Sequence, residues 1–257
     1  MMKRLTLLIC FILISAIIDA RQIEQYTIFE LELKGPSAGN PFNDVEVSAE
    51  FKLMNRSLFC EGFYDGEGIY KIRFMPDQTG EWTYTTKSNI PQLDSKKGSF
   101  TCTKPTEGNH GPVKVRNTYD FGYADGTPYY PVGTTCYAWV HQPEELVNQT
   151  LANFSGTAFY KMRMTVMLKN YYVYINNEPP LYPFEGSKEK GWDFSRPNPA
   201  FFRNFEQKIL ELQKLGVEAD VILFHPYDMG KWNFDKMNID EASFYLRYLI
   251  ARISSLR

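Results

Sequence analysis

The sequence predicts a multidomain chain in which an all-β sandwich of immunoglobulin size precedes strand–helix units with parallel strands. Three observations support this order. Between residues 21 and 105, short segments rich in Val, Ile, Phe, Tyr and Thr alternate with turn residues at intervals of roughly ten residues. Residues 106–127 form a turn-rich connector. From residue 128 to residue 257, strand patterns alternate with helical ones.

Residues 1–20 have the pattern of an export signal. Lys3 and Arg4 precede the apolar run 5–18, and Ala20 supplies a small residue for cleavage. The apolar run is shorter than the ~20 residues of a comfortable membrane span. We therefore expect residues 1–20 to be removed and the mature chain to be secreted or periplasmic, with no membrane span.

Composition excludes some functions and leaves others open. The net charge of −2 gives no electrostatic attraction to nucleic acid or to an acidic membrane. The 17 Tyr, 19 Phe and 4 Trp fit a sugar-binding surface, but they fit an ordinary core equally well. The sequence contains no metal or cofactor motif, so no cofactor is expected, and the oligomeric state is left open.

Three cysteines lie outside the signal, at positions 60, 102 and 136, and their spacing fits no zinc pattern. Cys60 and Cys102 fall on expected strands of the first domain. They could form a disulfide in an oxidising compartment, or all three could be buried thiols. The sequence does not decide between these two states.

The clearest strand of the first domain is 45–53. Val45, Val47, Ala49, Phe51 and Leu53 alternate with polar residues, as expected of a strand with one face toward solvent. A later strand carries Trp82 and Tyr84, two residues apart and therefore on one face. That face is either a sugar-binding platform or part of the core, and the core is the favoured reading.

The second half of the chain predicts three strand–helix units. Strands are expected at 129–139, 158–168 and 218–224. Pro143 opens the first helix, and Asn198 with Pro199 caps the second, which Gly216 ends. The third helix is expected at 240–256. The first strand-to-helix turn has no glycine-rich phosphate loop, which argues against a dinucleotide-binding sheet and leaves a β/α barrel or another open parallel sheet.

Polar and aromatic residues follow each of the three strands at the same end. In a β/α barrel the active site lies at the carboxyl ends of the strands. Rings with hydrogen-bonding groups between them suit a sugar, whose apolar faces stack on rings while its hydroxyls need partners. The candidate substrate-binding residues are Tyr137, Trp139, Arg163, His225, Tyr227, Asp228 and Trp232. Each has an alternative structural role: Arg163 could pair with a structural carboxylate, His225 could be a core histidine, and the rings could be packing. The segment 170–196 is expected to be a loop over this pocket.

Four segments carry a resemblance to a known family: "GFYDGEGIYKIRFMPDQTGEWTYTTKS", "GNHGPVKV", "YADGTPYYPVGTTCYAW" and "GVEADVILFHPYD". Together they resemble secreted bacterial proteins in which a sandwich of unassigned function precedes a clan-A glycoside hydrolase barrel of the apiosidase-like or cellulase-like kind. The resemblance covers nearly the whole mature chain. It implies an N-terminal immunoglobulin-like β-sandwich at 21–105, followed at 128–257 by the first three βα units of a (β/α)8 TIM barrel.

The resemblance also implies an activity: hydrolysis of O-glycosidic bonds in a poly- or oligosaccharide by a retaining mechanism with two glutamates. Arg163 matches an arginine near the nucleophile, and His225 matches a histidine of the sugar-binding site. The two glutamates belong to later strands and are expected beyond residue 257. We therefore assign no catalytic residue and expect the 257-residue chain alone to be inactive. The alternatives are a non-catalytic carbohydrate-binding protein and a structural fragment without activity.

Overall fold

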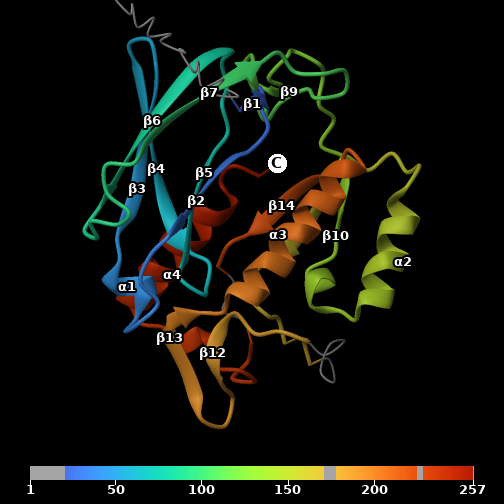
Figure 1. Cartoon of the computed structure of the whole chain (residues 1–257). Coiled ribbons are helices and arrows are strands. Elements are labelled where there is room, and N and C mark those ends of the chain that lie inside the picture. The colour runs from blue at the N-terminus through green and yellow to red at the C-terminus, as the bar shows by residue number, and fades with distance from the viewer. Residues whose placement is uncertain (1–20, 171–177, 225–227, 257) are drawn as a thin grey trace, which may run out of the picture.

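The computed structural model describes residues 21–170, 178–224 and 228–256 (Figure 1). His225 and Tyr227, together with Tyr171, Tyr172 and Tyr174, lie outside the described residues. None of the helices in the described ranges has both the length and the apolar character needed to cross a bilayer.

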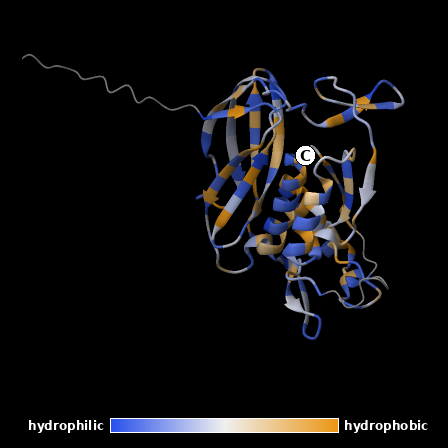
Figure 2. Cartoon of the chain, turned by 90° about the vertical axis from the view of Figure 1, so that its right-hand side faces the viewer, coloured by the Kyte–Doolittle hydropathy of each residue, from blue (hydrophilic) through white to orange (hydrophobic). Residues whose placement is uncertain are grey.

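A seven-stranded sheet forms the first part of the molecule. Its spatial order is β1-β7-β6-β3-β4-β5-β2. The strands are β1 (Gln22–Glu24), β2 (Phe29–Lys34), β3 (Val47–Leu53), β4 (Arg56–Tyr64), β5 (Ile69–Phe74), β6 (Gly80–Ser88) and β7 (Lys97–Thr103). The short helix α1 (Pro41–Asp44) lies between β2 and β3. Figure 2 shows the hydrophobic and hydrophilic residues alternating as bands along these strands.

The sheet curls until its two ends approach each other. Phe29 in β2 stacks on Phe100 in β7 with ring centroids 4.3 Å apart, although β2 is the last strand of the order and β7 is the second. The expected alternation in β3 is confirmed, because Val47, Ala49 and Phe51 are buried. One nearly closed sheet therefore surrounds this core.

Trp82 and Tyr84 face that core, so they offer no sugar-binding platform. Trp82 is fully buried, and its indole N–H donates to the carbonyl of Gln78 at 2.8 Å. Tyr84 contacts the ring of Phe29 at 5.5 Å. The reading of this strand face as core is confirmed.

The cysteines of the structure are free thiols. Cys60 in β4 and Cys102 in β7 stand three strands apart in the sheet order, with β6 and β3 between them. A disulfide needs Cα atoms within about 7 Å, whereas adjacent strands alone are about 4.8 Å apart. The geometry therefore does not support a bridge between these two residues.

The second part of the molecule contains a three-stranded parallel sheet of order β10-β11-β14. Its strands are β10 (Gly133–Thr135), β11 (Lys161–Thr165) and β14 (Glu218–Ile222). The helices are α2 (Glu144–Phe154), α3 (Pro199–Lys214) and α4 (Ile239–Ile253), with short 3-10 turns at Trp139–His141 and Phe234–Lys236. Two hairpins, β8 (Val113–Arg116) with β9 (Asp120–Tyr123) and β12 (Phe184–Ser187) with β13 (Gly191–Pro197), lie at opposite ends of the molecule (Figure 1).

The two longer helices, α3 and α4, each begin after an asparagine that caps the N-terminus. The side chain of Asn198 accepts a hydrogen bond from the backbone N–H of Ala200, with Pro199 in the first turn. Asn238 and Glu241 form a reciprocal capping box at the start of α4. The predicted start of the second helix is confirmed, and the third begins one residue before the predicted position.

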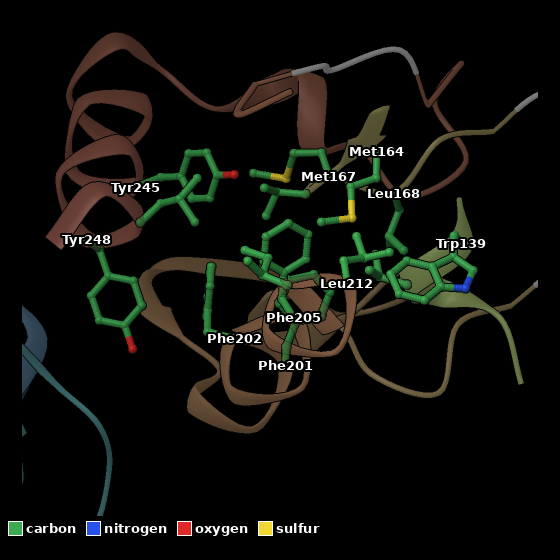
Figure 3. Close-up of a cluster of buried hydrophobic side chains, with 14 of the residues drawn as sticks. Trp139, Met164, Met167, Leu168, Phe201, Phe202, Phe205, Leu212, Tyr245 and Tyr248 are labelled. Atoms are coloured by element: carbon green, nitrogen blue, oxygen red, sulfur yellow. The ribbon is translucent and has the colours of Figure 1, made fainter. Parts of the chain in front are cut away.

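The core of the second part lies between the parallel sheet and the helices α3 and α4. Figure 3 shows side chains of α3, α4 and the β11 region pointing toward one another. Met162 and Met164 in β11 and Phe202 in α3 are completely buried. The indole of Trp139 also belongs to this cluster.

The expected fold class, an immunoglobulin-like sandwich followed by the first three βα units of a TIM barrel, is wrong. Seven of the fourteen strands in the described residues belong to the single curled, nearly closed sheet, and β10, the first strand of the three-stranded parallel sheet, has only three residues. Helix α4 packs against the curled sheet, where the Tyr248 hydroxyl donates to the carbonyl of Tyr64 at 3.0 Å. Local alternation and helical spacing are the same in these architectures, so they could not reveal how the elements close on one another.

Candidate functional site

The candidate site lies at the carboxyl ends of the three parallel strands. Because β10, β11 and β14 pair in parallel, their carboxyl ends share one edge of the sheet. Tyr137 follows β10, Lys169 follows β11, and Lys231 follows β14. The β12–β13 hairpin lies at the same end of the molecule (Figure 1).

Arg163 lies on β11 directly opposite Asp220 on β14. Its Nη2 atom is 2.9 Å from Asp220 Oδ2, and Lys161 Nζ reaches the same oxygen at 2.9 Å. Burial alone would raise the pKa of Asp220, but the hydrogen bonds from Lys161 and Arg163 outweigh it and lower the pKa. The sheet thus presents an ionised carboxylate between two cations, and Arg163 remains partly open to solvent with 46% of its side chain exposed.

Tyr137 is fixed by both its side chain and its backbone. The ammonium of Lys169 lies 3.9 Å from the centroid of the Tyr137 ring. The carbonyl of Tyr137 accepts hydrogen bonds from the backbone N–H and the hydroxyl of Thr165, at 3.1 and 2.9 Å. A ring and a cation are therefore placed side by side at the ends of β10 and β11.

Three of the predicted site residues are buried. Trp139 is 4% exposed, and Asp228 is completely buried. The Asp228 carboxylate accepts hydrogen bonds from the backbone N–H groups of Gly230 and Phe234, both at 2.8 Å. Asp228 thus holds the turn that follows β14. Trp232 is 2% exposed, but its indole N–H donates outward to Glu178.

Glu178, which the sequence analysis did not select, is the centre of a polar and aromatic cluster. Its Oε2 accepts from the Tyr182 hydroxyl at 2.8 Å and from the Trp232 indole at 3.0 Å. Lys231 Nζ lies 2.8 Å from Oε1, and 55% of the Glu178 side chain stays exposed. Nothing in the local sequence distinguishes Glu178, because it stands in the 170–196 segment, where no periodic pattern orders the residues.

Aromatic rings complete this group. Tyr182 and Trp192 have ring centroids 4.9 Å apart, and the Trp192 indole donates to the carbonyl of Trp232 at 2.6 Å. Lys231 Nζ lies 4.4 Å from the centroid of the Trp232 ring. We call Glu178, Tyr182, Trp192, Lys231 and Trp232 the Glu178 cluster.

The electrostatics keep Glu178 and Tyr182 each in one protonation state near neutral pH. Burial alone would raise the pKa of Glu178, but hydrogen bonds from Lys231, Tyr182 and Trp232 outweigh it and lower the pKa. Burial, followed by the neighbouring carboxylate, raises the pKa of Tyr182 to about 12. Glu178 is therefore an ionised acceptor and Tyr182 a neutral donor, which suits hydroxyl recognition better than proton donation. The described residues contain no group of three His, Cys, Asp or Glu side chains that could hold a metal ion.

Comparison with known proteins gives one match to the first part of the chain and one that covers nearly all of it. Residues 22–89 match the model of a domain of unknown function, DUF5060. The fold is similar to the crystal structure of "a putative glycoside hydrolase from Bacteroides vulgatus ATCC 8482", with 46% sequence identity and a TM-score of 0.88. That match covers 92% of this chain and 48% of the other, so the chain spans about half the length of the solved protein.

Two further matches are too weak to carry an argument. A family 39 glycoside hydrolase from Bacteroides cellulosilyticus WH2 is 11% identical with a TM-score of 0.25, covering 90% of this chain and 39% of that one. A pullulanase complexed with maltotriose, from Anoxybacillus sp. LM18-11, is 7% identical with a TM-score of 0.22, covering 81% and 34%. No curated protein matches the chain.

Proposed function

We propose that the chain is the sugar-binding portion of an exported glycoside hydrolase that acts on poly- or oligosaccharides. The observation that carries this proposal is the 46% identity, over 92% of the chain, to a solved protein described as "a putative glycoside hydrolase". The signal-like pattern of residues 1–20 supports export.

The chemistry at the carboxyl ends of the parallel strands agrees with a saccharide ligand. The Glu178 cluster offers an ionised acceptor, a phenol donor and indole rings within hydrogen-bonding or ring-contact distance of one another. Arg163 and Asp220 add a second donor and acceptor pair on the sheet. Sugars need this combination of ring faces and polar partners.

In this proposal, hydrolysis follows a retaining course, with two carboxyl groups about 5 Å apart that act as nucleophile and acid/base. A general acid needs a raised pKa, whereas the pKa values of Glu178 and Asp220 are both lowered. We therefore assign both carboxylates to substrate binding and neither to proton transfer.

The test is an assay of the natural gene product, expressed to its own stop codon, on a panel of plant, animal and bacterial polysaccharides. Release of reducing ends is expected from at least one of them, and NMR of the first-formed product is expected to show the anomer of the substrate. A folded protein that releases no sugar from any polysaccharide would overturn the proposed hydrolase. Release of the opposite anomer would overturn the retaining course alone.

A further inference from the structure

A groove with a volume of about 680 Å³ lies between the curled sheet and helix α4. Its floor is the outer face of β3, β4 and β6, and its walls come from α1 and α4. No residue of the groove belongs to the Glu178 cluster or to the Arg163–Asp220 pair. We call it the sheet–helix groove. Its volume falls within the range of small-molecule sites, about 300–1,000 Å³.

Three residues paired across adjacent strands form a row on the floor of the groove. Ser48 in β3 is paired with Glu61 in β4 on one side and with Lys87 in β6 on the other. Glu61 and Lys87 are thus two strands apart, with about 10 Å between their Cα atoms and Ser48 between them. Among the described side chains, none forms a hydrogen bond or an ion pair with either of these two. Both charged groups are exposed and available to a ligand.

The helical wall adds rings and a second cation. Phe244, Arg247 and Tyr248 of α4 line the groove, and Arg247 is exposed. Phe42 of α1 closes the other side, with its ring 5.7 Å from Tyr248 and 4.9 Å from Tyr64. The Phe42 and Phe244 rings are only partly buried, so they can still contact a ligand.

The groove is held in shape without a ligand. At one end, the Asn89 side chain accepts from the backbone N–H of Glu46 at 2.9 Å and donates to the carbonyl of Asp44 at 2.8 Å. At the helical wall, the Tyr248 hydroxyl is bound to the carbonyl of Tyr64. A preformed site avoids the cost of ordering its own loops on binding.

The charges identify the class of ligand. Lys87 and Arg247 are cations, and Glu46 and Glu61 are carboxylates, so the formal charges lining the groove cancel. An anion or a cation would meet as much repulsion as attraction, whereas hydroxyl groups can use both the donors and the acceptors. Partly exposed rings suit the apolar face of a sugar ring. We propose that the sheet–helix groove binds a neutral oligosaccharide, as a second saccharide site apart from the carboxyl-end site. The choice of a sugar as ligand rests on the proposed function.

The test is binding of the full chain to a printed array of neutral and acidic oligosaccharides, followed by calorimetry with the best neutral hexasaccharide. Arg247→Ala and Glu61→Gln are each expected to weaken binding by about tenfold, the effect of losing one hydrogen bond to a charged group. Glu32→Gln is the matched control, because Glu32 is an exposed strand carboxylate outside the groove. Its affinity is expected to equal that of the wild type.

Three results would overturn the proposed groove site: binding to no array member, preference for acidic members, or equal affinity in all three variants. The outcome is separate from that of the hydrolase proposal. If binding depends on Arg247 while the natural gene product releases no sugar from any polysaccharide, the hydrolase proposal is overturned and the groove site is supported. If the natural gene product hydrolyses a polysaccharide but binding is unaffected by the Arg247 and Glu61 substitutions, the hydrolase proposal is supported and the groove site is overturned.

Discussion

Arg73 in the curled sheet and Glu206 in α3 form a buried ion pair, with 3.0 Å between Arg73 Nη2 and Glu206 Oε2. Arg252 of α4 donates to the other oxygen of the same carboxylate and lies 2.9 Å from Asp65 Oδ1 at the end of β4. Its guanidinium also lies over the ring of Phe63, 4.4 Å from the centroid. This network joins the sheet to both long helices, and all four of its charged residues are buried.

Replacing Glu206 is expected to destabilise the whole protein. Glu206→Gln leaves the buried Arg73 and Arg252 without a shared counter-charge, which should lower the free energy of unfolding by about 3 kcal/mol. Urea denaturation measures this change. The control is Glu145→Gln on the exposed face of α2, where a change below about 0.5 kcal/mol is expected. Equal effects of the two substitutions would contradict the role given to the network.

His141 is expected to make stability depend on pH. Its side chain is buried beside the ring of Phe201, and burial lowers its pKa from 6.5 to about 4. The unfolded chain takes up a proton at higher pH than the folded one. The contribution of neutral His141 to the free energy of unfolding is therefore complete above pH 6.5. It is lost as the pH falls toward 4, and the total loss is roughly 3 kcal/mol.

His141→Phe removes this titration. The other titrating groups contribute equally to both proteins, so their contributions cancel in the difference in unfolding free energy between the variant and the wild type. That difference should change in favour of the variant between pH 6.5 and pH 4.5. A difference that stays constant over this range would show that His141 is not buried in its neutral form.

Cys60 and Cys102 are expected to be free thiols in the native protein. Burial raises the pKa of both to about 11, so their reaction with a thiol reagent in the folded protein should be slow. In denaturant, the reagent should detect the same number of thiols with and without prior reduction. An increase of two thiols after reduction would reveal a disulfide and contradict the sheet order.

Arg163→Ala is expected to weaken function without unfolding the protein. Its ion pair with Asp220 is partly exposed, so the free energy of unfolding should change by less than about 1 kcal/mol. If the natural gene product is the proposed hydrolase, its turnover of polysaccharide should fall by about tenfold or more. Lys161→Ala is the matched control, because it removes a cation from the same Asp220 oxygen. Unchanged turnover in Arg163→Ala would remove Arg163 from the site.

Glu178→Gln tests the Glu178 cluster. The amide keeps the size of the side chain but loses the negative charge that accepts from Lys231, Tyr182 and Trp232. We expect the Michaelis constant of the natural gene product to rise by about tenfold, since binding loses a charged acceptor. Glu185→Gln, an exposed carboxylate in β12, should leave the constant unchanged. A fall in turnover number with an unchanged Michaelis constant would instead place Glu178 in the chemical step.

Local elements could be predicted from the sequence because their signals are local. The alternation in 45–53 marks β3, and Asn198 with Pro199 marks the start of α3, since each depends only on near neighbours. The closure of the sheet depends on the contact between Phe29 and Phe100, which are far apart in sequence. Alternation is identical in a sandwich and in a curled sheet, so the fold class was mistaken.

The same limit applies to the site. A polar residue after a strand can face a ligand or can hold the turn, and Asp228 does the second through the N–H groups of Gly230 and Phe234. Glu178 has one partner close in sequence, Tyr182, and gains the other two, Lys231 and Trp232, from a chain segment more than fifty positions away. No spacing rule could have selected it before the fold was known.

The sharing of one carboxylate by Arg73 and Arg252 bears on how this protein can change over time. A gene rearrangement that carried residues 22–103 into another protein would separate Arg73 from Glu206 and Asp65 from Arg252, and would leave them only Glu30 and Lys71 as partners. The curled sheet is therefore not expected to be transferred between proteins as an independent domain. Related proteins that contain it should also contain the helices beside it.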